Sequence, residues 1–277
     1  MRRLTLKLSV KLSLIVLAAY FAAAVFGEIQ YRLAEWKDVT PAYNVVHTDL
    51  RYQPPSANAW LGTDNLGRSV ALRLIQGSRI AFYVGVMTSL IAIPLGALLG
   101  LLGGYFGGKI DSLVTWITAT VASMPGLLFI LAISLVVGKG LTGIIVGIAL
   151  TSWVSTCRTI RAETMKHRDR AYVQAAKSLG YSNWRILFRH ILPNVSHLIL
   201  IQFSIRFPAA VSTEVFISFL GIGVQGEPSW GVMINNARTR LWQGVWWEFA
   251  FTTAAIFILV LVFNYLTDYL RDRTLRT

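Results

Sequence analysis

Long uncharged runs alternate with shorter polar segments along almost the whole sequence. A helix needs about 20 mainly apolar residues to cross the hydrocarbon core of a membrane, and most of these runs approach or exceed that length. The pattern therefore predicts an all-α polytopic membrane protein with six transmembrane helices. The predicted spans are residues 12–27, 80–108, 112–138, 140–157, 191–224 and 249–267.

Prolines and glycines modify two of these predicted spans. Pro94 is expected to kink the second span, and Pro125 lies midway along the third. Gly96, Gly100 and Gly104 are spaced four residues apart, so they share one face of the second span. Because glycine has no side chain, this face is predicted to let another helix come close.

The composition favours a membrane protein over a soluble domain. Of the 277 residues, 55% are hydrophobic and 14% are charged, and the mean hydropathy is +0.56. The net charge of +13 is also found in nucleic-acid-binding proteins, but here the charges fall in the gaps between apolar runs. We therefore expect no nucleic acid as a partner. Cys157 is the only cysteine, so an intramolecular disulfide is impossible, and we expect its side chain to pack as a small hydrophobe.

Residues 1–79 are predicted to form a membrane anchor helix followed by an external segment, and residues 80–277 to hold the other five spans. Residues 22–24 are three alanines and resemble a signal-peptidase site. The alternative, which we favour, is an uncleaved signal anchor. Further spans follow this one, and the first span helps to set their orientation.

The distribution of basic residues predicts which parts of the chain face the cytoplasm. With the N-terminus inside, the inner segments carry 16 of the 26 Lys and Arg residues and the outer segments carry nine. Membrane proteins keep an excess of Lys and Arg on the cytoplasmic side. Both termini are therefore expected in the cytoplasm. The same holds for the polar block of residues 158–193, between the fourth and fifth spans.

The polar block of residues 158–193 is predicted to contain two short helices joined by a glycine turn. Gly180 is expected to end the first helix, Ser182 to cap the second, and Pro193 to end it. Such an element can dock into a partner protein, or it can lie as an amphipathic loop on the lipid surface. The expected apolar face of the first helix consists of Ala171, Tyr172, Ala175, Ala176 and Leu179.

Three short motifs of this block resemble the EAA loop of ABC importer permeases. They are Gln174-Ala175-Ala176, Gly180 and Ile191-Leu192-Pro193, with Gln174 standing where the family usually has Glu. In that family the loop is a coupling helix that sits in a cleft of the cytoplasmic ATPase subunit. The resemblance implies that the ATPase-coupling residues are Tyr172, Gln174, Ala175, Ala176, Gly180, Ile191, Leu192 and Pro193.

Two other segments resemble the dipeptide, oligopeptide and nickel branch of these permeases. Residues 62–68 are similar to a GTD-x-LGRD signature, in which Ser69 replaces the last Asp, and Asp64 is close enough in sequence to Arg68 to pair with it. Residues 228–231 are similar to a PSWG signature and are expected in a re-entrant outer loop near the membrane surface. The external signature residues are Gly62, Thr63, Asp64, Gly67, Arg68, Pro228, Ser229, Trp230 and Gly231.

Residues 103–109 fit the G-x-x-x-x-G-K pattern of a phosphate-binding loop. The next residue is Ile110 instead of Ser or Thr, so the hydroxyl that binds magnesium in such loops is missing. The pattern also ends a predicted membrane helix, and a tight inner turn is the better interpretation. We therefore do not expect this chain to be an enzyme or to bind a cofactor. ATP and Mg are expected to be bound by partner ATPase subunits. No metal site is expected, because no His or Cys pairs with another ligand at metal-binding spacing.

Two ionisable residues, Arg206 and Glu214, lie inside the predicted fifth span. Charged groups at membrane depth are costly, so they normally face protein or water. Eight residues separate the two, which places them roughly two helical turns apart on nearby faces. They are candidates to line a translocation path. The alternative is a structural pair, satisfied at an interface with a partner permease.

The resemblance covers about residues 58–273 and implies a bacterial inner-membrane permease subunit of an ATP-driven importer. Its implied partners are a homologous second permease, two cytoplasmic ABC ATPase subunits, an external solute-binding protein and membrane lipid. Di- or oligopeptides are favoured as the substrate over nickel, because no cluster of His, Cys or Met suggests metal handling. Two functions of a different class stay open, namely a non-transporting receptor component and an ion-coupled carrier. The coupling loop and the lack of repeated intramembrane carboxylates argue against the carrier.

Overall fold

The computed structural model describes residues 8–138, 140–224 and 226–274. Within these residues the chain is α-helical, and β-structure is limited to two isolated bridges between residues 56 and 69. The predicted all-α fold is therefore confirmed. Several basic residues that entered the topology prediction lie outside the described residues, namely Arg2, Arg3, Lys7, Lys139 and Arg276.

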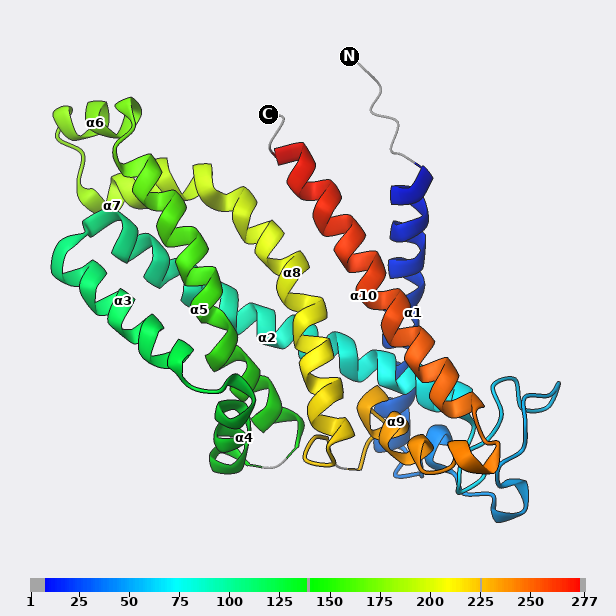
Figure 1. Ribbon diagram of the computed structural model, residues 1–277. Coiled ribbons are helices and arrows are strands. Elements are labelled where there is room, and N and C mark those ends of the chain that lie inside the picture. The colour runs from blue at the N-terminus through cyan, green and yellow to red at the C-terminus, as the bar shows by residue number, and fades with distance from the viewer. Residues whose placement is uncertain (1–7, 139, 225, 275–277) are drawn as a thin grey trace. The chain divides into compact units, whose positions relative to one another are not determined.

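The helices follow one another with short connections, except for one longer segment between the first two (Figure 1). That segment contains two 3₁₀ turns, η1 (Ala42–Asn44) and η2 (Thr48–Leu50). Two more helical turns are η3 (Ile186–Ile191) and η4 (Leu241–Gln243). The α-helices are α1 (Leu8–Trp36), α2 (Val70–Phe106), α3 (Gly108–Ser123), α4 (Gly126–Val137), α5 (Leu141–Arg168), α6 (Ala171–Ser178), α7 (Asn183–Arg185), α8 (Leu192–Phe219), α9 (Trp230–Arg238) and α10 (Trp247–Thr274).

Five helices of the described chain are long and apolar enough to cross a membrane, namely α1, α2, α5, the continuous helix Asn183–Phe219 and α10. The pair α3 and α4 passes the same test only when its two helices are taken together, and they are bent by 93° at their break (Figure 1). The predicted third span is thus broken in two. Met124 is extended (φ −81°, ψ 139°), because the ring of Pro125 disfavours a helical conformation at the preceding residue.

Several helices extend beyond the apolar runs that predicted them. The helix α1 continues to Trp36, although its uncharged run ends at Gly27. Charged residues do not end a helix by themselves, and Glu28 and Arg32 form an ion pair of 2.5 Å at helical spacing. The helix α2 likewise begins at Val70, ahead of the predicted residue 80. The non-helical part of the predicted external segment is correspondingly short.

The described residues form two compact units. The first unit contains residues 8–86, 140–141 and 208–269, so it holds α1, the first turns of α2, α9 and most of α10. The second unit contains residues 87–138, 142–207 and 270–274, so it holds the rest of α2, α3 to α7 and the first half of α8.

A glycine seam joins α2 to α5 within the second unit. A Cβ atom built on Gly96, Gly100 or Gly104 would lie 2.6, 2.7 and 2.7 Å, respectively, from a carbonyl oxygen of α5. Real Cβ atoms do not approach backbone atoms so closely, so only glycine allows this contact. The predicted close approach of another helix is therefore confirmed. Cys157 lies in the seam and is fully buried, as expected for a small hydrophobe.

Candidate functional site

The helix α6 ends where the sequence predicted, at a glycine turn. Gly180 has a φ of +76°, which an L side chain rarely adopts. The N–H of Gly180 donates to the carbonyl of Lys177 at 2.9 Å, and the N–H of Tyr181 donates to the carbonyl of Ala176 at 3.1 Å. These two hydrogen bonds form a Schellman motif. The turn sends the chain back toward α7 within the second unit (Figure 1).

The predicted apolar face of α6 is divided in the structure between a buried and an exposed side. Val173 and Ala176 are buried, whereas Ala171, Ala175 and Leu179 are exposed, and Leu179 keeps 72% of its surface accessible. Ala176, which was expected on the side that meets a partner, lies in the core of this chain instead. Alanines occur on several sides of this helix, so their spacing does not identify the covered side. The exposed face, hereafter the outward face of α6, consists of Ala171, Gln174, Ala175, Ser178 and Leu179.

The covered face of α6 belongs to a hydrophobic core shared with neighbouring helices of the second unit. Tyr172 packs at its edge, and burial raises the pKa of the Tyr172 phenol. Its hydroxyl and Nδ1 of His167 are 2.8 Å apart, at hydrogen-bond distance. The buried members are Ala97, Leu101 and Tyr105 of α2, Ile160 of α5, Val173 and Ala176 of α6, Ile186, Leu187 and Ile191 of η3, and Val195 of α8.

The second helix of the polar block does not end at Pro193, contrary to the prediction. Ser182 caps it as expected, since its hydroxyl accepts the N–H of Arg185 at 3.4 Å. The helix then widens into the π-helical turn η3, in which the N–H of Leu192 donates to the carbonyl of Leu187. A proline has no N–H to donate to the carbonyl four residues before it. A π-turn ahead of the proline is one way for the helix to continue despite this missing hydrogen bond. Pro193 consequently lies in the first turn of α8.

Polar contacts tie the block to the adjoining ends of α2 and α3. The hydroxyl of Tyr105 donates to Oδ1 of Asn183 at 2.9 Å. Arg161 binds both carboxylate oxygens of Asp111, one of them at 2.6 Å. The segment that resembles a phosphate-binding loop is the turn between α2 and α3, where Gly107 has a φ of +67°. Arg168 donates to a main-chain carbonyl of this turn region, that of Gly104, at 3.4 Å.

In the first unit, the first external signature forms a closed loop around Asp64. Its Oδ1 accepts the N–H groups of Leu66 and Arg68 at 2.8 and 2.9 Å, and its Oδ2 accepts Nε of Arg68 at 2.7 Å. The predicted ion pair is therefore confirmed. Arg73 of α2 lies 3.4 Å from the same oxygen, and Asp64 is almost completely buried. Gly62 and Gly67 have φ values of +78° and +73°, which the loop requires.

Two tryptophans of the later chain hold this loop and α2 in the first unit. The indole N–H of Trp247 donates to the carbonyl of Thr63 at 3.0 Å, and that of Trp230 donates to the carbonyl of Leu74 at 3.1 Å. Each ring lies against a glycine, because a Cβ on Gly62 or Gly77 would come within 2.6 or 2.2 Å of it. Trp230 is buried and begins α9, a short helix in the connection between α8 and α10.

Glu214 is buried and hydrogen-bonded within the first unit. Its Oε1 accepts the hydroxyl of Ser218 at 2.6 Å, and Ser229 is its second hydrogen-bond partner. The hydroxyl of Ser229 also accepts the N–H of Val232 at 3.3 Å, which caps α9. Glu214 therefore links α8 to Ser229, at the start of α9, by a hydrogen bond. Arg206, in the second unit, is half-buried, and its Nε has no hydrogen-bond partner among the described residues.

Arg79 links several segments of the first unit through its side chain. The sequence did not predict these contacts. Arg79 donates to Glu28 of α1 at 2.6 Å and to Glu227, which follows α8, at 2.5 Å. Its guanidinium also lies 3.8 Å from the ring centre of Tyr31. These partners are far from Arg79 in the sequence, and only its position in the predicted external segment hinted at an ion pair.

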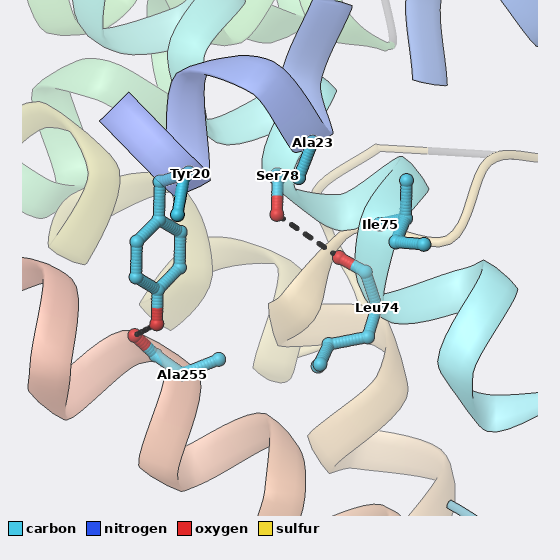
Figure 2. A pocket seen from close by; sticks show the side chains of 7 residues that line it. Tyr20, Ala23, Leu74, Ile75, Ser78 and Ala255 are labelled. Carbon is cyan, nitrogen blue, oxygen red and sulfur yellow. Dashed lines mark hydrogen bonds between the residues drawn. The ribbon is translucent and has the colours of Figure 1, made fainter. Parts of the chain in front are cut away.

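An apolar crevice of about 220 Å³ opens between α1, α2 and α10 of the first unit (Figure 2). The hydroxyl of Tyr20 donates to the main-chain carbonyl of Ala255 at 2.9 Å. The hydroxyl of Ser78 donates to the main-chain carbonyl of Leu74 at 3.2 Å. Both hydroxyls are thus engaged by the main chain, and alanines supply most of the remaining lining. Among the described residues, no group of three His, Cys, Asp or Glu side chains is placed to hold a metal ion.

Comparisons with known proteins find similar sequences over most of the chain. The family described as "Binding-protein-dependent transport system inner membrane component" matches residues 92–276. The dipeptide transport system permease protein DppC of Bacillus subtilis is 39% identical over 83% of this chain and 73% of its own length. The glutathione transport system permease protein GsiD of Pectobacterium atrosepticum is 35% identical over 91% and 84%. The oligopeptide transport system permease protein OppC of B. subtilis is 33% identical over 94% and 81%.

Solved structures share the fold at low sequence identity. An amino acid ABC transporter with histidines superposes with a TM-score of 0.57 at 17% identity, over 73% of this chain and 94% of the other. An inward-facing form of the MetNI methionine ABC transporter gives a TM-score of 0.55 at 17% identity, over 73% and 95%.

Proposed function

The chain belongs to the family of binding-protein-dependent transport system inner membrane components, and from this premise we propose that it forms half of the translocation pathway of an ATP-driven peptide importer. Relatives that match most of its length are named as dipeptide, oligopeptide and glutathione permeases. All three solutes are small peptides. Peptides are accordingly the proposed substrate class.

The observation that carries the proposal is the two-sided character of α6. Val173 and Ala176 are fixed in the core of the second unit, while Leu179 and its neighbours on the outward face remain uncovered. A short helix with one anchored side and one exposed side suits docking into a partner protein. The partner proposed here is a cytoplasmic ATPase subunit, which would supply the ATP and Mg that this chain does not bind.

The packing around α6 supports a mechanism in which this helix moves the spans. Its covered face shares one core with residues of α2, α5 and α8. The Tyr105–Asn183 and Arg168–Gly104 hydrogen bonds reinforce that core. Dense packing transmits displacement because it resists compression. When two ATPase subunits close on ATP, a push on the outward face of α6 would therefore rock these spans together and change the side to which the path opens.

The remaining assignments are part of the same proposal. Residues 1–79 supply an anchor helix and an external segment, and residues 80–277 form the permease domain. Both termini and α6 lie in the cytoplasm of a bacterial cell, as the excess of basic residues favours. The complete importer contains a homologous second permease, two ATPase subunits and an external solute-binding protein. The loop around Asp64, buttressed by Trp247, braces the external segment against α2 and α10.

A charge on the outward face of α6 tests the docking. Leu179→Arg places a cation where Leu179 is 72% exposed, so the fold of this chain should be retained while docking of the ATPase subunits is disrupted. We expect the variant to co-purify with less ATPase and to lose stimulated ATP hydrolysis. Asn194→Arg is the matched control, because Asn194 is exposed on α8 in the same unit. Normal ATPase association of Leu179→Arg would exclude the outward face as the docking site.

A further inference from the structure

Arg206 places a positive charge on a helix that is long and apolar enough to cross the membrane. The continuous helix Asn183–Phe219 has a mean hydropathy of 1.3 over its most apolar window, and Arg206 lies well inside it. A guanidinium at such depth is costly unless it meets water or an anion. Its presence therefore needs a physical reason.

Arg206 differs in its partners from two other arginines of the described residues. Arg79 and Arg161 each form ion pairs with carboxylates of their own unit. Arg206 has no carboxylate within ion-pair distance among the described residues, and its buried Nε lacks a hydrogen-bond partner there. Arg206 as a residue is only partly buried, so part of its surface remains accessible. This cation is available to an anion that the described residues do not provide.

The neighbourhood of Arg206 extends this polarity toward α5. Gln202 lies one turn earlier on the same face of α8 and is 5% exposed. Its Oε1 accepts the hydroxyl of Thr156 of α5 at 3.3 Å, so the other end of the amide presents N–H donors. Arg206 and Gln202 together offer donors, which are the complement of a carboxylate.

We propose that Arg206 binds the free carboxylate of the solute as it passes through the second unit, and that this solute is a short peptide with an unblocked C-terminus. The inference rests on the proposed function, because it assumes that peptides are transported. It adds a specific recognition group to that function. An arginine suits this role, since its planar fork binds both oxygens of a carboxylate and it keeps its charge when partly desolvated.

The test compares uptake of alanyl-alanine by the assembled importer, reconstituted with its binding protein, in four versions of this chain. Wild type and Arg238→Gln, which removes an exposed cation outside the spans, should transport equally. Arg206→Gln should lower the initial uptake rate about ten-fold or more, as expected for the loss of a charged hydrogen bond. Arg206→Lys keeps the charge and should recover part of the rate. Alanyl-alanine amide, which lacks the carboxylate, should be affected less than the free peptide by Arg206→Gln.

The outcomes separate this inference from its premise. An unchanged uptake rate in Arg206→Gln would overturn the carboxylate site. Failure of Arg206→Gln to assemble with the second permease, with assembly restored by Arg206→Lys, would also overturn it and would assign Arg206 to an acid of that partner. If the wild-type complex couples ATP hydrolysis to neither peptide, the proposed substrate class fails instead.

Discussion

A single methyl group in the glycine seam between α2 and α5 should measurably destabilise the protein. In Gly100→Ala, the new Cβ would lie 2.7 Å from the carbonyl oxygen of Cys157 and 2.9 Å from the backbone nitrogen of Arg161. An ordinary contact starts at 3.4 Å, and neither backbone atom can move without moving α5. Overpacking of this kind costs about 1–3 kcal/mol, which outweighs the gain of up to about 1 kcal/mol from replacing glycine in a helix.

Gly126→Ala is the matched control for this substitution. Gly126 is also helical, at the start of α4, but a Cβ there would meet no atom within 4 Å. Its stability should equal or slightly exceed that of the wild type. The measurement is the free energy of unfolding of each purified variant in one detergent, obtained by denaturant titration. If Gly100→Ala proves as stable as Gly126→Ala, α2 and α5 are not as close as the structure places them, and the reasoning is refuted.

Three further experiments probe the first unit and the orientation of the chain. Trp247→Phe removes the hydrogen bond to Thr63, so it should cost about 0.5–1.5 kcal/mol in the same titration, and no loss would mean that the indole does not hold the loop. Glu214→Leu leaves the hydroxyls of Ser218 and Ser229 without their buried acceptor and should cost about 1–3 kcal/mol, whereas Glu214→Gln should retain most of the stability; equal stability of both variants would remove the structural role of Glu214. A membrane-impermeant thiol reagent added to intact cells should label His47→Cys, and it should label His167→Cys only after the membrane is permeabilised. The opposite pattern would invert the proposed topology.

Features with a short repeat were predictable from the sequence, and long-range partners were not. The four-residue spacing of Gly96, Gly100 and Gly104 predicts the seam because helix periodicity places them on one face. Gly180 likewise identifies the end of α6, because the turn requires a positive φ. In contrast, Arg79 pairs with Glu227, which is 148 residues away, and no local pattern encodes such a contact.

The differences between the structure and the expectations have equally specific causes. Alanines on several sides of α6 make the covered side ambiguous, and the packing of Val173 against other helices decides it. Pro193 signals a helix end by its chemistry, but a π-turn before it lets the helix continue. At Pro125 the reverse occurs, since an uncharged run long enough for one span contains a break of 93°. The spacing of Arg206 and Glu214 is compatible with a pair, yet Glu214 takes its hydrogen bonds from two serines.

The most direct test of the central claim is peptide uptake by the complete importer in proteoliposomes. The chain would be reconstituted with its second permease, ATPase subunits and binding protein, and uptake of labelled alanyl-alanine would be followed with and without ATP. The account predicts uptake that requires ATP and that falls to background with Leu179→Arg but not with Asn194→Arg. Uptake that proceeds equally without ATP, or that is unaffected by Leu179→Arg, would contradict it.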